Sequence, residues 1–174
     1  MNFLPNPLHP ALVHFPIVLI VLGAAVSLIA VFWRKGYVPT FAAVLLVLGA
    51  VGAWVATETG ESDGGLVENT NAQVEPLLEA HENWAKRTVT AAAIAAVIAT
   101  GAAGLFRFPR AARGVAVAAA LAAGVASWTV YETGHRGGAL VYQHGAGVNT
   151  SGTATVTTTA TAPQTGNAPR EDRD

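Results

Sequence analysis

The sequence contains no cysteine and few charged residues, and each shortage excludes a class of protein. Without cysteine the chain forms no disulfide, thiolate zinc site, iron–sulfur cluster, covalently attached c-type haem or thiol nucleophile. Charged residues make up 12% of the chain, about half of the ~25% that a soluble domain carries. The net charge of -1 offers no basic field for nucleic acid. A water-exposed globule and a nucleic-acid-binding protein are therefore both disfavoured.

Long apolar stretches occupy the sequence instead. A helix needs ~20 mainly apolar residues to cross a bilayer, and four segments without Asp, Glu, Lys or Arg approach or exceed this length: residues 11–33, 38–57, 88–106 and 114–131. The last two are rich in Ala, Gly and Thr, so buried helices of a soluble protein are the alternative for them. No Lys or Arg precedes the first segment, and it is too long for a signal-peptide core, so we expect it to be retained. The sequence predicts an all-α, polytopic membrane protein.

The cations between the segments predict how the protein is oriented. Five of them lie in the two short links, namely Arg34 and Lys35 in the first link and Arg107, Arg110 and Arg113 in the last. Because positive loops stay in the cytoplasm, both termini are expected outside the inner (plasma) membrane. Lys86, Arg87 and Arg136 lie on the opposite side and count against this orientation.

An internal repeat divides the apolar region into two halves. Residues 54–67 match residues 128–141 at a constant offset of 74, with identical Trp, Glu, Thr, Gly, Gly, Leu and Val. The chain is therefore expected to use one helical hairpin twice, giving a four-helix bundle of two tandem hairpins related by an axis along the membrane normal. Small residues of the third and fourth segments are expected at the helix contacts: Gly101, Gly104, Gly114, Ala118, Ala120 and Gly124.

Composition changes outside the four apolar segments. Residues 150–165 contain eight threonines and a charged end follows, so residues 148–174 are expected to form a disordered, Thr-rich external tail. The four-helix domain then covers residues 1–147. Between the second and third segments, a short helix is expected over residues 74–84 that runs into the third segment, with Pro76 in its first turn.

All five histidines fall near the predicted external ends of the segments: His9, His14, His81, His135 and His144. A lone interfacial histidine is commonly a hydrogen-bonding residue, but five at one end of a bundle favour a binding site, because imidazole is the commonest metal ligand. His14 lies just inside the first segment, and an ionisable group at membrane depth indicates a functional site. His9 would lie ~140° from His14 on a regular helix, so the two cannot share a face.

Opposed imidazoles from two helices are what a bis-histidine haem b requires, and such sites are built in the cores of bundles. Both predicted hairpins open near a histidine, His14 in the first and His81 in the second. These two residues are the favoured axial ligands. His135 and His9 are alternates, or ligands of a second haem.

One glutamate in each repeat lies where the helix dipole disfavours a carboxylate. Glu58 and Glu132 each lie in what the sequence predicts as the last helical turn, before a Thr-Gly pair in which Gly60 or Gly134 would be the C-terminal cap. A carboxylate there is disfavoured by up to ~1 kcal/mol by the helix dipole. A hydrogen bond from the N–H of a metal-bound imidazole would offset this cost. The structural alternative is an ion pair with one of three cations, Lys86, Arg87 or Arg136.

Three stretches of the chain resemble a known family. They are residues 8–17 (Leu-His-Pro-Ala-Leu-Val-His-Phe-Pro-Ile), the block from His81 to Trp84, and residues 131–142 with their Thr-Gly-His-Arg-Gly-Gly element. Over roughly residues 4–147 the chain is similar to the DUF2231 family of predicted bacterial four-helix membrane proteins. Domains of this family are sometimes fused to Rieske or c-type cytochrome modules, so the resemblance implies redox partners. This chain contains neither module.

The leading interpretation is a haem b-binding electron-transfer module of the lipid bilayer, with a redox partner protein at the external face. The second is a non-haem site for zinc, copper or iron, with ligands drawn from His9, His14, His81, His135, His144, Glu58 and Glu132. The third is a structural or anchoring membrane protein without a cofactor. A homo-oligomer is compatible with all three. None names a catalytic residue, so the sequence favours a binding or electron-transfer module over an enzyme.

Overall fold

The computed structural model describes residues 9–33, 37–64, 74–105 and 107–145, and these ranges contain helices and no strand. The helices are α1 (His9–Leu12), α2 (His14–Phe32), α3 (Val38–Gly64), α4 (Glu75–Gly104) and α5 (Pro109–His144). Four candidate spans, the first combining α1 and α2, are long and apolar enough to cross a membrane. The prediction of an all-helical membrane bundle is confirmed. The expected tail at residues 148–174 lies outside the described residues.

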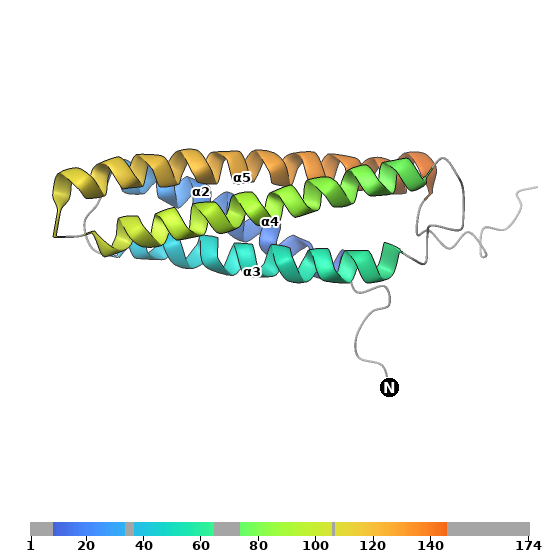
Figure 1. Ribbon diagram of the computed structural model, residues 1–174, viewed down its shortest axis with the longest axis horizontal. Helices are drawn as coiled ribbons and strands as arrows, with labels where there is room; N and C mark the ends of the chain where they lie inside the picture. The colour runs from blue at the N-terminus through green and yellow to red at the C-terminus, as the bar shows by residue number, and fades with distance from the viewer. Residues whose placement is uncertain (1–8, 34–36, 65–73, 106, 146–174) are drawn as a thin grey trace, which may run out of the picture.

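The helices α2 to α5 run up and down along one elongated bundle (Figure 1). Each contacts two neighbours, because α2 packs on α3 and α5, and α4 packs on the same two helices. The short helix α1 packs on α3 and α2. Since α3 contacts both α2 and α4, the bundle is a closed ring, and its division into two tandem hairpins stays a prediction.

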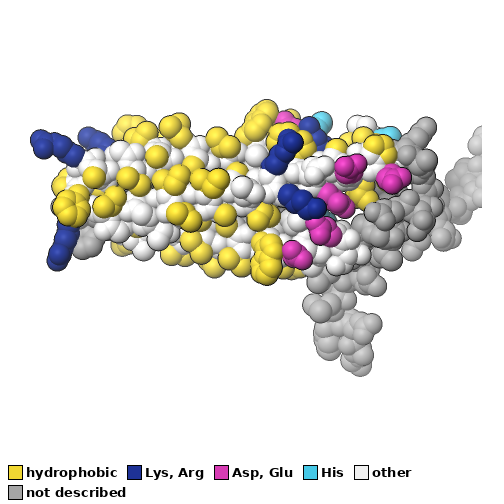
Figure 2. Space-filling model, viewed as in Figure 1, with side chains coloured by type: hydrophobic (Ala, Val, Ile, Leu, Met, Phe, Trp, Pro, Cys, Tyr) yellow, Lys and Arg dark blue, Asp and Glu magenta, His cyan; other side chains and the backbone are white. Residues whose placement is uncertain are grey.

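The two ends of the bundle differ in charge. One end, the arginine end, carries Arg107, Arg110 and Arg113 around the turn between α4 and α5. The other, the polar end, consists of α1 and of residues 58–64, 75–87 and 132–144 of α3, α4 and α5. Figure 2 shows hydrophobic side chains over the middle of the bundle, Lys and Arg at one end, and Asp and Glu together with Lys, Arg and His toward the other. This distribution is that of a bundle whose middle faces lipid.

Alanine, not glycine, lines the buried faces of α4 and α5. Buried alanines recur every three or four residues, which places them on one face of each helix: Ala92, Ala95, Ala99 and Ala102 in α4, and Ala112, Ala116, Ala119, Ala123 and Ala126 in α5. Small side chains let the two backbones approach. The prediction for the glycines was wrong, because a Cβ at Gly104, Gly114 or Gly124 would meet nothing within 4 Å and one at Gly101 only Val115 at 4.0 Å.

Close approach through glycine occurs between α2 and α3 instead. A Cβ at Gly49 would lie 2.8 Å from Cγ1 of Ile20, and one at Gly23 would lie 2.8 Å from Cγ of Leu46. Ile20 and Leu46 are the two largest fully buried side chains among the described residues. Each therefore fills a notch that a glycine leaves in the opposite helix.

The helices continue beyond the charge-free segments. Gly60 and Gly134 lie inside α3 and α5, so the prediction that they cap helices was wrong. The residue after α5 with a left-handed backbone is Gly145, at φ 64°, and its N–H bonds to the carbonyls of Leu140 and Val141. The expected helix before the third segment is confirmed, because α4 runs unbroken from Glu75 to Gly104. These extensions persist because they pack on one another, and they form the polar end.

Candidate functional site

Two imidazoles meet inside the polar end. His9 begins α1 and His81 lies in the second turn of α4, and their ring centroids are 6.3 Å apart with the ring planes at 86°. Both side chains are half-buried. This histidine pair, His9 and His81, therefore joins the first candidate span to the third.

The same kind of hydrogen bond holds each ring. The Nδ1 atom of His9 lies 2.7 Å from the carbonyl oxygen of Ala56, and that of His81 lies 3.0 Å from the carbonyl oxygen of Thr133. A carbonyl oxygen only accepts, so Nδ1 carries the proton and donates it in both rings. In the neutral imidazole Nε2 is then the unprotonated nitrogen. Metal-binding histidines are oriented in this way, by a carbonyl that accepts from the nitrogen away from the metal.

A glycine lies four residues after each acceptor and lets the ring approach the helix. A Cβ at Gly60 would lie 2.9 Å from Nδ1 and Cε1 of His9, and a Cβ at Gly137 would lie 3.0 Å from Cε1 of His81. Imidazole, backbone carbonyl and glycine thus form one structural element that occurs twice, once on α3 and once on α5. The two rings are held as equivalents.

Hydroxyl groups support the His81 side of the pair. The Oγ1 atoms of Thr88 and Thr133 are 2.9 Å apart, and Thr88 is buried. Thr88 Oγ1 also lies 3.0 Å from the carbonyl oxygen of Trp84. These contacts tie α4 to α5 beside the ring of His81. They restrain the backbone of Thr133, whose carbonyl accepts the hydrogen bond from His81.

Burial lowers the pKa of His81. His81 lies in the polar end, outside the charge-free segment of α4, and desolvation lowers its pKa below the usual value. The hydrogen bond to the carbonyl of Thr133 acts in the opposite direction, and the positive charge of Arg136 lowers the pKa further. The neutral form is the one that binds a metal.

Several charged residues around the pair form ion pairs or contact the ring of Trp84. Glu132 pairs with Arg136 one turn later in α5, so the ion-pair alternative applies to this glutamate. The Arg136 guanidinium lies 4.5 Å from the ring centroid of Trp84, and that of Arg87 lies 4.9 Å from it. Lys86 Nζ lies 2.8 Å from Oε1 of Glu61. The exposed Glu58 is a more distant neighbour, whose charge acts on Lys86.

The structure brings His9 to His81 and leaves the other three histidines on the surface. His14, the expected partner of His81, is exposed on α2. His135 is exposed and stacks on Tyr131, with centroids 6.1 Å apart and planes at 15°, and His144 is exposed at the end of α5. Within the described ranges, no group of three or more His, Asp or Glu side chains is placed to hold a metal ion.

Sequence reasoning did not identify the residues that orient the rings, Gly60 and Gly137 among them. A signal was present, because glycine is costly inside a helix and two glycines in long polar helical extensions indicate close approach. The sequence repeat aligns Gly60 with Gly134, however, whereas the structure makes Gly60 equivalent to Gly137, one turn further along α5.

Comparison with known protein families gives a match to a family described as predicted membrane protein (DUF2231), over residues 5–150. Neither the curated proteins nor the solved structures contain a match to this chain.

Proposed function

We propose that this chain, which belongs to the DUF2231 family of predicted membrane proteins, binds haem b between His9 and His81 and transfers electrons at the polar end of its bundle. The observation that supports this proposal is the histidine pair itself. Two half-buried imidazoles come from different helices, and the Nδ1 of each donates to a backbone carbonyl, which leaves Nε2 unprotonated. Haem iron supplies one-electron chemistry when it is bound.

The rings of His9 and His81 lie close together, with centroids 6.3 Å apart and planes at 86°, so both could hold one iron between them. His14 and His135, the other sequence candidates for this role, are exposed and play no part in the pair.

The number of ligands favours haem over a bare metal ion. A zinc, copper or iron site built from side chains alone takes three or four protein ligands. No such group exists in the described part of the chain. A porphyrin provides four nitrogens itself, so two imidazoles complete the coordination of its iron.

The polar end is proposed to face outward. The link at the arginine end contains cations and no carboxylates, as cytoplasmic links of inner-membrane proteins often do. Both termini then lie outside, and a redox partner protein would dock on the polar end, closest to the histidine pair.

The test is an optical spectrum of the full-length protein purified from haem-replete cells. The proposal expects a Soret band that shifts on reduction with dithionite. His9→Ala and His81→Ala should each remove it or shift its position, because each removes an axial ligand. His14→Ala and His135→Ala are matched controls that should leave the spectrum unchanged. Absence of haem from the wild-type protein, or an unchanged spectrum in both pair variants, would contradict the proposal.

A structural role is the second candidate, and the hydrogen bonds favour it. Each imidazole already ties one helix to the backbone of another. If this is the whole function, the protein contains neither haem nor stoichiometric metal by elemental analysis. His9→Ala and His81→Ala then lower only the unfolding temperature.

A further inference from the structure

An ion pair lies beside one ring of the histidine pair. Arg136 pairs with Glu132, and its Nη1 atom also donates to the backbone carbonyl oxygen of Glu132 at 3.1 Å. In the sequence Arg136 lies between Thr133, whose carbonyl accepts from His81, and Gly137, against which the ring of His81 lies. The ion pair therefore belongs to the same turn of α5 as the contacts that hold this ring.

The corresponding position beside His9 is uncharged. On α3 the residue directly before the contacting glycine is Thr59, and its hydroxyl donates to the carbonyl oxygen of Val55, four residues earlier, at 3.1 Å. Arg136 makes the same backbone contact with Glu132 on α5. The two elements thus share one hydrogen-bond pattern and differ in charge. Because the ring of His9 is held without a charge, holding a ring is not what the ion pair is needed for.

The ion pair is partly shielded from water. The side chain of Glu132 is 17% exposed and that of Arg136 is 32% exposed. The guanidinium of Arg136 also lies over the ring of Trp84, 4.5 Å from its centroid, and Trp84 follows His81 by three residues in α4. Partly buried charges are screened by salt and water less than surface charges are. They therefore act on whatever is bound at the histidine pair.

We propose that Arg136 and Glu132 set the reduction potential of the haem held by His9 and His81, with Arg136 raising it and Glu132 lowering it. This inference rests on the proposed function. Reduction of a ferric centre adds one electron, so a nearby positive charge stabilises the reduced form and a nearby carboxylate stabilises the oxidised form. Both are positioning residues, which act through their charge and not as ligands.

The experiment measures the midpoint potential of the full-length protein, purified from haem-replete cells, by optical redox titration at low ionic strength. Arg136→Gln should lower the ratio of reduced to oxidised haem roughly tenfold at a fixed applied potential, which is a midpoint about 59 mV lower for one electron. Glu132→Gln should raise the midpoint, because it leaves the charge of Arg136 without its partner. Arg136→Lys keeps the positive charge and should stay near the wild-type value.

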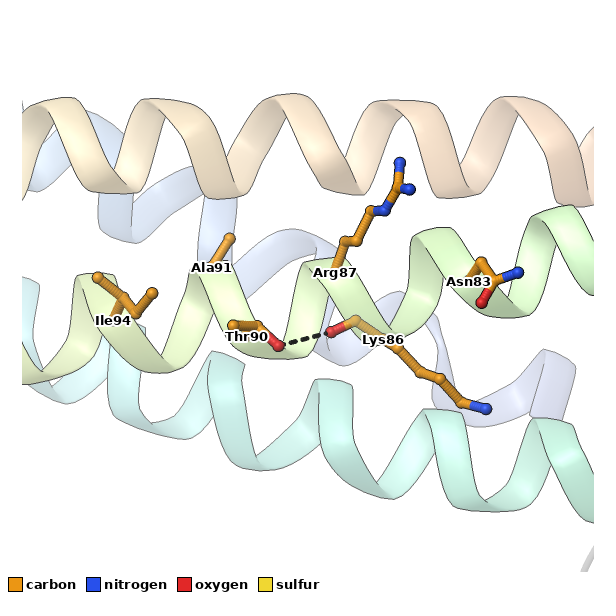
Figure 3. Close-up of a pocket in the computed structure, with 6 residues that line it drawn as sticks. All are labelled: Asn83, Lys86, Arg87, Thr90, Ala91 and Ile94. Atoms are coloured by element: carbon orange, nitrogen blue, oxygen red, sulfur yellow. Dashed lines mark hydrogen bonds between the residues drawn. The ribbon is translucent and has the colours of Figure 1, made fainter.

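Arg87→Gln is the matched control for loss of a guanidinium. Arg87 lies over the same Trp84 ring, 4.9 Å from its centroid, but it is exposed to solvent. Figure 3 shows its side chain extending from α4 toward α5, away from Lys86. Because exposed charges are screened, Arg87→Gln should change the midpoint much less than Arg136→Gln does. An equal change in both would overturn the assignment to Arg136.

The sign of the two shifts separates an electrostatic role from a structural one. Breaking a purely structural ion pair disturbs the site in the same way from either side, so both variants would then move the midpoint in the same direction. Opposite shifts support the proposal; shifts of one sign, or no shift, overturn it while haem binding stands. If Arg136→Gln does not fold, a lower midpoint in Glu132→Gln overturns the proposal and a higher one supports it. Absence of haem from the wild-type protein overturns the proposed function and this inference together.

Discussion

The geometry of the histidine pair depends on the two glycines that the rings contact. Gly60 lies against His9 and Gly137 lies against His81, and in each case an added Cβ would come within 3.0 Å of the ring or closer. An imidazole displaced from this position would leave its backbone carbonyl. The glycines therefore let each ring reach the carbonyl that accepts its Nδ1 proton.

Gly137→Ala is predicted to cost the hydrogen bond between His81 and Thr133, about 0.5–1.5 kcal/mol of the free energy of unfolding. Gly134→Ala is the matched control, because it lies one turn earlier in the same helix and a Cβ there would meet nothing within 4 Å. It should stabilise the protein by up to ~1 kcal/mol through helix propensity. Thermal unfolding in detergent, followed by circular dichroism, compares the two. Equal stabilisation by both alanines would show that the position of the His81 ring does not depend on the absence of a side chain at residue 137.

The sequence predicted that His14 and His81 converge, whereas the structure places His9, and not His14, beside His81. His14 attracted attention because it lies inside the apolar segment, beside Pro16. The prediction that His9 and His14 cannot share a helix face agrees with the structure, in which one is half-buried and the other exposed. Which of the two faces inward depends on the packing of α1 against α3, and a single sequence does not contain that information.

At the scale of the helices, the strongest local constraint is the contact between α2 and α3. A methyl group at Gly49 would lie 2.8 Å from a side-chain carbon of Ile20 and 3.2 Å from its backbone nitrogen. The side chain of Ile20 is fully buried, and because the contact includes its backbone nitrogen, turning the side chain alone would not relieve it. The two helices would therefore have to separate.

Gly49→Ala is accordingly predicted to lower the free energy of unfolding by roughly 1–3 kcal/mol, the usual cost of overpacking a core. Gly124→Ala introduces the same methyl group on the outer face of α5, where nothing lies within 4 Å, and should change stability by less than ~0.5 kcal/mol. Unfolding titrations in mixed micelles measure both. A tolerated alanine at Gly49 would mean that α2 and α3 are less closely packed than described.

The helices themselves were predictable because their apolar stretches are long, but their ends were not. Thr-Gly pairs after Glu58 and Glu132 favour helix termination locally, yet α3 continues to Gly64 and α5 to His144. Packing between the extensions outweighs the local preference of one glycine, about 1 kcal/mol. Packing also outweighs local sequence in α4 and α5. Their buried faces follow the spacing of the alanines, and Gly104, Gly114 and Gly124 lie on the outer faces.

For the whole molecule, the two chemically different ends predict one orientation in the membrane. The turn between α4 and α5 contains three arginines, whereas the polar end combines cations with carboxylates that neutralise them, as in the pairs Lys86–Glu61 and Arg136–Glu132. Cations in a short link hold that link in the cytoplasm, and acids have little influence. The three arginines should therefore outweigh the dispersed cations of the polar end.

Because the chain has no cysteine, a single introduced thiol reports the orientation without background. Ser62→Cys places one on the exposed surface of α3 at the polar end, and Arg110→Cys places one at the arginine end. A membrane-impermeant maleimide added to intact spheroplasts should label Ser62→Cys at once and Arg110→Cys only after the membrane is opened. Arg110→Cys removes one of the orienting charges, so Ala111→Cys, exposed next to it, is the control that retains all three arginines. The reverse pattern in both variants would place the histidine pair on the cytoplasmic side.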